Sequence, residues 1–317
     1  MITDAGKWKK AGSFLSRYGI YVAFFLLVAV LTIVFPPFLK PSNIINVLRQ
    51  TAVNGILAVG MTFVIVTGGI DLSVGSILAL SAVVATSFAH PGEHALAVPL
   101  LLGLLVGCAC GALNGVLIAK KRLAPFIVTL AMMAAARGLA LVYTSGRPVI
   151  NLSDAYNQIG GGYWLGIPLP VLIFLVIIAA GIFLLHYTRF GRYVFAIGGN
   201  ELAARVSGIH TDRILIKVYI IMGALSGVAG MVLSSRVMSG SPAMGEGYEL
   251  DAIAAVVIGG TSLFGGIGSI ADTIAGALII GVMNNGLDML NVSSYWQQVV
   301  KGVIIVLAVV MDKRAKR

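Results

Sequence analysis

The stretch Gly68-Gly69-Ile70-Asp71-Leu72-Ser73-Val74-Gly75-Ser76 places a carboxylate and two hydroxyls among glycines, between two long apolar runs. A second stretch, Gly259-Gly260-Thr261-Ser262-Leu263-Phe264-Gly265-Gly266, repeats this arrangement near the other end of the chain. Backbone of this kind cannot face lipid, because its amide groups would lack hydrogen-bond partners there. It must be buried in protein or line an aqueous cavity. The pattern therefore indicates a transport protein rather than a simple membrane anchor.

The composition is that of a chain that crosses a membrane repeatedly. Of its 317 residues, 58% are hydrophobic and 11% are charged, and the mean hydropathy is +0.98. Soluble domains carry roughly 25% charged residues. A membrane-crossing helix needs about 20 residues, so the chain has room for about ten of them. The sequence therefore predicts an all-α polytopic membrane protein.

The apolar runs give the positions of the predicted helices. By hydropathy they cover residues 20–36, 45–67, 72–89, 96–119, 124–144, 168–187, 214–235, 249–260, 270–288 and 295–311. The second run is interrupted by Asn54 and several glycines, and the eighth is short, so these two are the weakest. The first run ends in Phe35-Pro36-Pro37-Phe38 without a small-residue cleavage site, which predicts an uncleaved span rather than a signal peptide.

The positive charge indicates which side of the membrane each loop faces. The net charge is +10, from 22 Lys and Arg against 12 Asp and Glu. If both termini are cytoplasmic, most of these cations fall in cytoplasmic segments, as the positive-inside rule requires. No nucleic-acid-binding motif accompanies them. We expect a cytoplasmic segment at 1–19, one permease domain at 20–311 with a cytoplasmic loop at 188–213, and a basic cytoplasmic tail at 312–317.

The reactive side chains form no catalytic or metal-binding pattern. Cys108 and Cys110, two apart in an apolar run, point to different faces of a helix. His90 and His94 are separated by Pro91-Gly92, which breaks a helix, so a metal site is not expected. The sequence contains no nucleophile–base set and no G-x-x-x-x-G-K-S/T motif that would hold ATP. It predicts neither an enzyme nor a cofactor in this chain.

The longest predicted cytoplasmic loop contains a short helix with both ends marked. Its sequence is Gly198-Gly199-Asn200-Glu201-Leu202-Ala203-Ala204-Arg205-Val206-Ser207-Gly208-Ile209. Asn200 is a good N-cap, and Glu201 puts negative charge at the positive end of the helix dipole. Gly208 can adopt the left-handed conformation that ends a helix. Leu202, Val206 and Ile209 form an apolar stripe along one face of the predicted helix. Because a helix this short is marginal alone, we expect it to pack into a groove on a partner or to lie on lipid headgroups.

Further motifs accompany these two glycine-rich stretches and this helix. They are Ala58-Val59-Gly60-Met61-Thr62, Phe190-Gly191-Arg192, Tyr248-Glu249-Leu250-Asp251-Ala252-Ile253-Ala254-Ala255-Val256-Val257, Asn284-Asn285-Gly286-Leu287 and Ser293-Ser294-Tyr295. With this set the chain resembles, over nearly its full length, the permease subunit of a monosaccharide ABC importer. The resemblance is greatest to the ribose-type permeases and extends to their xylose, arabinose and galactoside relatives.

The resemblance implies a homodimeric permease of about ten spans per subunit, with the fold of the vitamin B12-type importers. The helix at 200–208 would be a coupling helix seated in a cleft of a separate cytoplasmic ATPase, which would bind ATP and Mg. The interface residues that it implies are Gly199, Asn200, Glu201, Leu202, Ala203, Ala204, Arg205 and Gly208. A periplasmic or lipid-anchored sugar-binding protein would deliver the substrate. The location it implies is the cytoplasmic membrane of a bacterium or archaeon.

A sugar pathway needs hydrogen-bond donors and acceptors, because sugars are neutral and rich in hydroxyls. The candidates are Asn54, Thr62, Thr67, Asp71, Ser73, Asn114, Asn284 and Asn285. Each of these alone fits a hydrogen bond between packed helices better than a pathway contact. For Asp71, capping of the next helix is favoured over direct contact with sugar. Arg137 lies deep in its span, where a charge must face protein, and we expect it to pair with a carboxylate.

Two other functions stay open. Broken helices and glycine-rich hairpins also occur in ion-coupled secondary transporters. An ABC permease for a nucleoside or an amino acid would share the glycine pattern as well. Uptake that survives without an ATPase but collapses with an ionophore would favour the first alternative, and competition between solutes would test the second.

Overall fold

The computed structural model describes residues 4–293, 295–303 and 306, with side chains from residue 19 onward. This part of the chain is almost entirely helical. Its helices are α1 (Asp4–Val34), η1 (Pro36–Leu39), α2 (Pro41–Val66), α3 (Val74–Ser87), α4 (Ala97–Lys121), α5 (Pro125–Thr144), α6 (Asp154–Gly161), α7 (Leu169–Ile182), η2 (Phe183–Tyr187), α8 (Arg189–Gly199), α9 (Glu201–Val206), α10 (Thr211–Arg236), α11 (Tyr248–Ile258) and α12 (Ile270–Met289). Residues 295–303 are also helical. Two short strands, β1 (Tyr163–Trp164) and β2 (Ile167–Pro168), form an antiparallel hairpin between α6 and α7.

Within the described residues, 6 helices are long and apolar enough to cross a membrane. They are α2, α4, α5, α7 continued through η2, α10 and α12. Two shorter apolar helices, Gly19–Val34 within α1 and Val74–Ser87, accompany them. Each predicted range from 20–36 to 270–288 overlaps a helix, and the range 295–311 lies partly outside the described residues. An all-α polytopic membrane protein is confirmed, and the number of about ten crossings stays a prediction.

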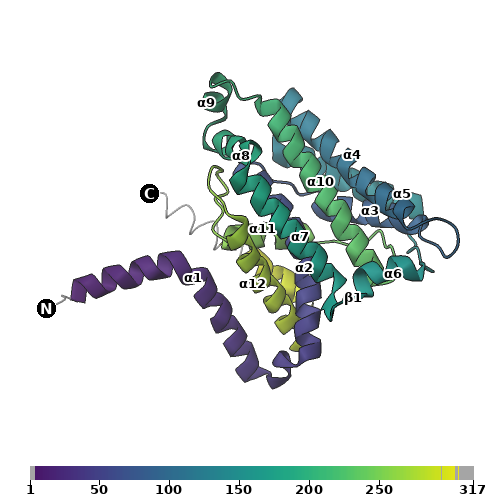
Figure 1. Ribbon diagram of the computed structural model, residues 1–317, viewed down its shortest axis with the longest axis horizontal. Coiled ribbons are helices and arrows are strands. Elements are labelled where there is room, and N and C mark those ends of the chain that lie inside the picture. The colour runs from purple at the N-terminus through teal and green to yellow at the C-terminus, as the bar shows by residue number, and fades with distance from the viewer. Residues whose placement is uncertain (1–3, 294, 304–305, 307–317) are drawn as a thin grey trace.

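Helix α2 lies at the centre of the bundle, packed against α7, α10, α11 and α12 (Figure 1). Every residue from Thr51 to Val66 is buried. A helix enclosed on all sides needs no lipid-facing stripe, so small and polar residues are tolerated all around it. This position explains why Asn54 and the glycines made the second predicted span one of the weakest in hydropathy.

Helices α4 and α10 approach each other closely because α4 carries a glycine on its inner face at every fourth position. A Cβ added at the last of these would lie 2.8 Å from the Cα of Ile216 on α10. Small residues at this spacing let two backbones pack tightly in a membrane. The glycines are Gly103, Gly107, Gly111 and Gly115. The opposite face of α4 exposes leucines, as a lipid-facing surface would.

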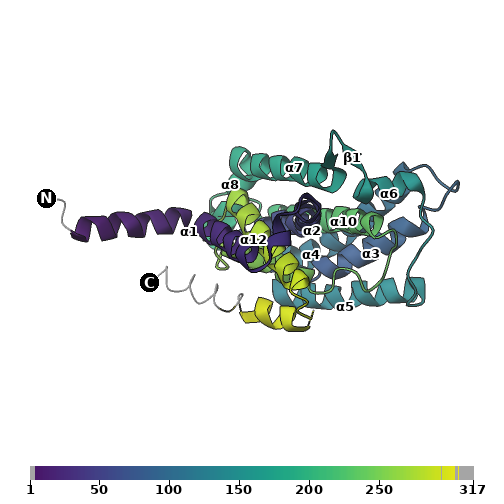
Figure 2. The same cartoon turned by 90° about the horizontal axis from the view of Figure 1, so that it is seen from below.

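The bundle has outer helices on two sides and two distinct ends. Seen from below, α7 and α5 lie on opposite sides, with α10 and α2 between them (Figure 2). In both outer spans only 22% of the most apolar segment is buried inside the chain. Helices α8 and α9 lie at one end of the bundle, hereafter the α9 end. Helix α6 and the β hairpin lie at the other, the α6 end.

The two glycine-rich stretches touch each other at the α9 end and are partly buried. Residues 67–73 link α2 to α3, and residues 259–269 link α11 to α12. The Gly266 N–H donates to the carbonyl of Val66 at 2.9 Å. Gly198 of α8 packs on the same two groups so closely that a Cβ there would collide with both. Asp71 and Ser73 in the first stretch and Thr261 and Ser262 in the second are buried, whereas Phe264 is 59% exposed. That these stretches avoid lipid stays a prediction.

Candidate functional site

Helix α9 forms where its end signals predict. The side chain of Asn200 accepts a hydrogen bond from the backbone N–H of Ala203 at 2.9 Å, and Gly208 has a positive φ of 85° just beyond the helix. The apolar side chains of Leu202 and Val206 are 72% and 82% exposed. Ala204 on the opposite face is buried against the rest of the chain. Helix α9 is therefore attached by one face and presents apolar side chains on the other.

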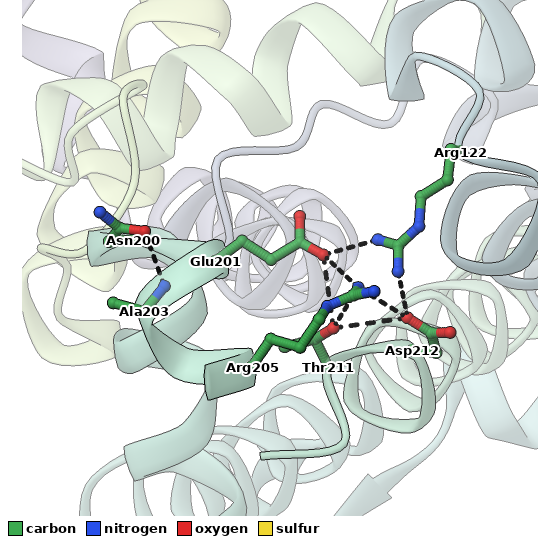
Figure 3. Close-up of polar contacts among 7 residues, drawn as sticks. All are labelled: Arg122, Asn200, Glu201, Ala203, Arg205, Thr211 and Asp212. Carbon is green, nitrogen blue, oxygen red and sulfur yellow. Dashed lines mark hydrogen bonds and ion pairs between the residues drawn. The ribbon is translucent and has the colours of Figure 1, made fainter. Parts of the chain in front are cut away.

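A cluster of ion pairs holds α9 against the neighbouring helix ends (Figure 3). The carboxylate of Glu201 accepts from Arg122 at 2.7 Å and from Arg205 at 3.0 Å. The same two arginines donate to Asp212 at 2.8 and 3.1 Å. These side chains are 41–44% exposed, so each pair contributes only about 0.2–1 kcal/mol. Their main effect is to fix the position of α9, because one network ties it to the ends of α4 and α10.

Two members of this cluster, Arg122 and Asp212, are not predicted from the sequence. Arg122 lies 79 residues from Glu201, and it lies 90 residues from Asp212. Arg122 has a left-handed backbone conformation, with φ of 56°, at the point where α4 ends. No local signal in the sequence links these positions, although a basic run after an apolar helix could have marked Arg122 as a helix end.

A cavity of about 310 Å³ lies beneath α9, between the first glycine-rich stretch and the connection from α4 to α5. Arg122 and Glu201 of the ion cluster line one part of it. Thr67, Gly69 and Tyr219 line another. The cavity thus connects the ion cluster at the α9 end with the buried polar backbone that the sequence singled out.

Three of the predicted pathway residues come together in one buried group. Oδ1 of Asp71 accepts from the backbone N–H of Ser73 at 2.8 Å and from its hydroxyl at 2.5 Å. The amide of Asn114 donates to the Ser73 hydroxyl at 3.0 Å. Ser73, not Asp71, occupies the N-cap position of α3, and its own side chain makes no capping bond. Asp71 therefore fixes the start of α3 indirectly, by holding Ser73.

Two other candidates belong to a separate buried group. The amides of Asn54 and Asn284 donate to Oδ2 of Asp251 at 3.2 and 3.1 Å. The ammonium group of Lys301 lies 2.8 Å from Oδ1 of the same carboxylate. Asp251 is 1% exposed and Lys301 is 14% exposed in its side chain. This group joins α2, α11, α12 and the helical segment at 295–303.

The remaining candidates take part in contacts between helices or within one. The Thr62 hydroxyl lies 2.9 Å from that of Thr273, and Asn285 exchanges hydrogen bonds with Asn43 at 2.9 and 3.0 Å. Thr67 donates to the carbonyl of Val64 and also lines the cavity. The predicted pathway set is therefore divided among several places, and of its members only Thr67 lines the cavity.

The prediction that Arg137 pairs with a carboxylate is wrong. Its guanidinium donates to the backbone carbonyls of Pro242 and Met244, the latter at 2.8 Å. The ion pairs found among the described residues do not include Arg137. The segment at 237–247 links α10 to α11 through turns, so some of its carbonyls need donors from elsewhere. Arg137 supplies them, an interaction that the sequence does not reveal.

Residues 43–309 match the family described as branched-chain amino acid transport system, permease component. The ribose import permease protein of Bacillus subtilis (strain 168) is 51% identical over 303 residues, covering 95% of this chain and 94% of the relative. The ribose import permease protein of Escherichia coli (strain K12) is 49% identical, covering 92% of each chain. The xylose transport system permease protein of the same strain is 39% identical, covering 88% and 87%.

No solved structure matches the chain. The family match covers most of the sequence, and the relatives align with almost all of it. The chain therefore belongs to the family of permease components of the branched-chain amino acid transport system type, and it is a multi-pass transport subunit rather than an enzyme.

Proposed function

We propose that this chain is the membrane-spanning translocation subunit of an ATP-driven importer for a monosaccharide, ribose or a similar sugar. One observation carries the proposal. The chain is 51% and 49% identical, over nearly its whole length, to permeases named for ribose import, and 39% identical to one named for xylose. Besides the ion-paired Arg122 and Glu201, the polar side chains that line the cavity are the hydroxyls of Thr67 and Tyr219, which suits a neutral solute rich in hydroxyls.

The energy for transport comes from a separate ATPase that binds ATP and Mg and receives α9 in a cleft. Support comes from the exposed apolar side chains of Leu202 and Val206 and from the ion cluster that fixes the helix behind them. The contact residues are Gly199, Asn200, Glu201, Leu202, Ala203, Arg205 and Gly208. Ala204, expected with them from the sequence, is buried against this chain instead. An apolar surface on so short a helix gains most by packing into a partner's groove.

The complete importer contains two copies of this chain, each with about ten spans in the fold of the vitamin B12-type importers. Both termini and the α9 end face the cytoplasm, which agrees with the concentration of Lys and Arg at 188–213. A periplasmic or lipid-anchored sugar-binding protein delivers substrate at the α6 end. The pathway draws on Asn54, Thr62, Thr67, Asp71, Ser73, Asn114, Asn284 and Asn285.

The decisive test changes the exposed face of α9. Leu202→Asp and Val206→Asp place charge on this face without touching the buried side of the helix. We expect each to reduce co-purification of the ATPase and ATP-driven uptake of labelled D-ribose by at least about tenfold, because a charge in an apolar interface costs more than about 1.4 kcal/mol. Ala204 is a poorer position for such a substitution than Leu202 or Val206, because it is buried.

Leu165→Asp is the matched control, because Leu165 is 83% exposed in the β hairpin at the α6 end. This variant should retain the ATPase. Normal uptake by both α9 variants would contradict the proposed coupling. Uptake that persists without any ATPase and collapses with an ionophore would show an ion-coupled transporter instead.

A second candidate function is a permease for another small solute. It is favoured by one observation, the description of the family as a branched-chain amino acid system. Competition for uptake among D-ribose, D-xylose, leucine and adenosine separates the two. Inhibition by the pentoses alone supports the sugar importer, and inhibition by leucine or adenosine supports the second candidate.

A further inference from the structure

A second cavity, of about 260 Å³, lies at the α9 end between α8 and the start of α10 (hereafter the α8–α10 cavity). The polar side chains that line it are those of Tyr193, His210, Arg213 and Lys217. Among the described residues, no carboxylate lines it. Arg and Lys are charged donors, and a tyrosine hydroxyl or a ring N–H of histidine can also donate. The α8–α10 cavity therefore concentrates positive charge and hydrogen-bond donors.

The charge of this cavity is not neutralised by neighbouring residues of the chain. The segment at 188–217 contains five Lys or Arg residues, but its only carboxylates are Glu201 and Asp212. Both of these accept from the two arginines of the ion cluster. The ion pairs found in the described part of the chain do not include Arg213 or Lys217. These two like charges lie four residues apart on one helix, where they repel each other, and an anion between them would relieve that repulsion.

The α8–α10 cavity lies where the hydrocarbon of a bilayer gives way to the lipid headgroups. Helix α10 is long and apolar enough to cross the membrane, and it begins at Thr211. The apolar helix formed by α7 and η2 ends at Tyr187, and α8 begins two residues later. Figure 1 shows α8 at the same end of the bundle as the start of α10. The cavity is thus lined by segments at the ends of two membrane-crossing helices, the level at which tyrosine side chains are enriched.

The walls of the cavity favour a phospholipid over a free ion. Arg and Lys both bind phosphate well, and the positive end of the α10 dipole adds to their effect. Ile209 and Ile214 line the same cavity, and their apolar surface suits the glycerol and the first part of an acyl chain. Basic pockets between transmembrane helices on the cytoplasmic side bind anionic headgroups in this way. A choline headgroup would instead bring its own positive charge close to Arg213 and Lys217.

We propose that the α8–α10 cavity binds the phosphate headgroup of an anionic phospholipid, with Arg213 and Lys217 as charged ligands and Tyr193 and His210 as further donors. Gly208 also lines the cavity and belongs to the link between α9 and α10. A headgroup in the cavity therefore lies against the segment that holds α9 in place. Lipid binding does not depend on which solute is transported, and only its effect on uptake rests on the proposed function.

The first test removes the two charges from the cavity. The purified full-length chain is titrated in detergent with dioleoyl phosphatidylglycerol, and bound lipid is counted by native mass spectrometry. In Arg213→Gln/Lys217→Gln we expect the apparent affinity for this lipid to fall by at least about tenfold, because two cations that face one phosphate are lost. Both side chains are exposed, so the double variant should fold. The exchange Arg213→Lys/Lys217→Arg keeps both charges and should keep the affinity.

A matched control removes the same charge at the same end of the bundle. Lys120 and Lys121 are exposed at the end of α4, next to the ion cluster, and they do not line the α8–α10 cavity. Lys120→Gln/Lys121→Gln should bind phosphatidylglycerol as the unmodified chain does. Equal losses of affinity in the two double variants would show general attraction to a basic surface and would overturn the proposal.

Two further ligands distinguish a lipid from a free anion. Dioleoyl phosphatidylcholine has the same acyl chains without net charge, and inorganic phosphate has the charge without the chains. We expect neither to displace bound phosphatidylglycerol. Displacement by inorganic phosphate at equal concentration would show a site for a free anion, and displacement by phosphatidylcholine would show that the headgroup charge is irrelevant. Either result would overturn the proposal.

The effect on uptake is measured with the complete importer in phosphatidylcholine vesicles with and without phosphatidylglycerol. We expect the anionic lipid to raise ATP-driven uptake of labelled D-ribose by the unmodified complex and by Lys120→Gln/Lys121→Gln, but not by Arg213→Gln/Lys217→Gln. Import of D-ribose together with unchanged lipid binding by Arg213→Gln/Lys217→Gln would refute the lipid site and leave the importer intact. Lipid binding as expected, with no import of any monosaccharide by the unmodified complex, would refute the proposed function and leave the lipid site intact.

Discussion

Among single residues, Asp251 shows how this chain tolerates charge inside a membrane bundle. Its carboxylate is almost completely buried, yet it faces the ammonium group of Lys301 and accepts hydrogen bonds from Asn54 and Asn284. A carboxylate in such a place is stable only when its charge and lone pairs are met. The group therefore holds the helical segment at 295–303 to the core, and the two asparagines are required for that purpose whatever else they contact.

Removing one member of this pair should destabilise the protein. Lys301→Met leaves the Asp251 charge buried without its partner, so we expect the free energy of unfolding to fall by about 3–5 kcal/mol. Thermal unfolding in detergent measures the loss. The double variant Asp251→Asn/Lys301→Met removes both charges and should recover most of the stability. A double variant as unstable as the single one would show that the ion pair is not the cause.

Among the elements, the packing of α4 on α10 depends on backbone contact rather than on side chains. Gly111 meets the backbone of α10 at Tyr219 so closely that no Cβ fits. Gly138 of α5, by contrast, has no neighbouring atom within 4 Å of an added Cβ. The two glycines look alike in the sequence, since both lie within apolar helical runs, and only the structure tells them apart.

This contrast gives a matched pair of variants. Gly111→Val must push α4 away from α10, which costs at least about 1–3 kcal/mol from overpacking, so we expect a lower yield of folded protein and a lower melting temperature. Gly138→Val makes the same chemical change where space exists and should have a much smaller effect. Equal losses in the two variants would mean that helix propensity, not helix contact, limits stability.

Local features of this fold could be predicted from the sequence, and contacts between distant segments could not. Apolar runs and caps are local, so they located the helices and defined both ends of α9 through Asn200 and Gly208. Contacts between distant segments produce no local sequence pattern. The Arg122–Asp212 pair and the carbonyl partners of Arg137 could not be predicted, because they depend on which helix ends the bundle brings together. For the same reason the pathway candidates, chosen by residue type, divided into separate groups.

For the whole molecule, the proposed orientation places the α9 end in the cytoplasm. It can be tested with single cysteines at its two ends, in a background with Cys108→Ala and Cys110→Ala. Val206→Cys and Leu165→Cys are both highly exposed positions, at 82% and 83%. In intact spheroplasts a membrane-impermeant maleimide should label Leu165→Cys at once, and should label Val206→Cys only after permeabilisation, because the bilayer blocks a charged reagent. The reverse pattern would invert the orientation and place the ATPase contact elsewhere.

The backbone junction of Val66, Gly198 and Gly266 has a mechanical consequence. Where side chains separate two segments, rotamer changes can absorb a small shift of one against the other. Here no side chain intervenes, so a displacement of α8 must be shared by the end of α2 and by the segment before α12. A shift of α8 by a fraction of an ångström therefore displaces both of these segments, and a larger side chain in place of Gly198 would force the three backbones apart.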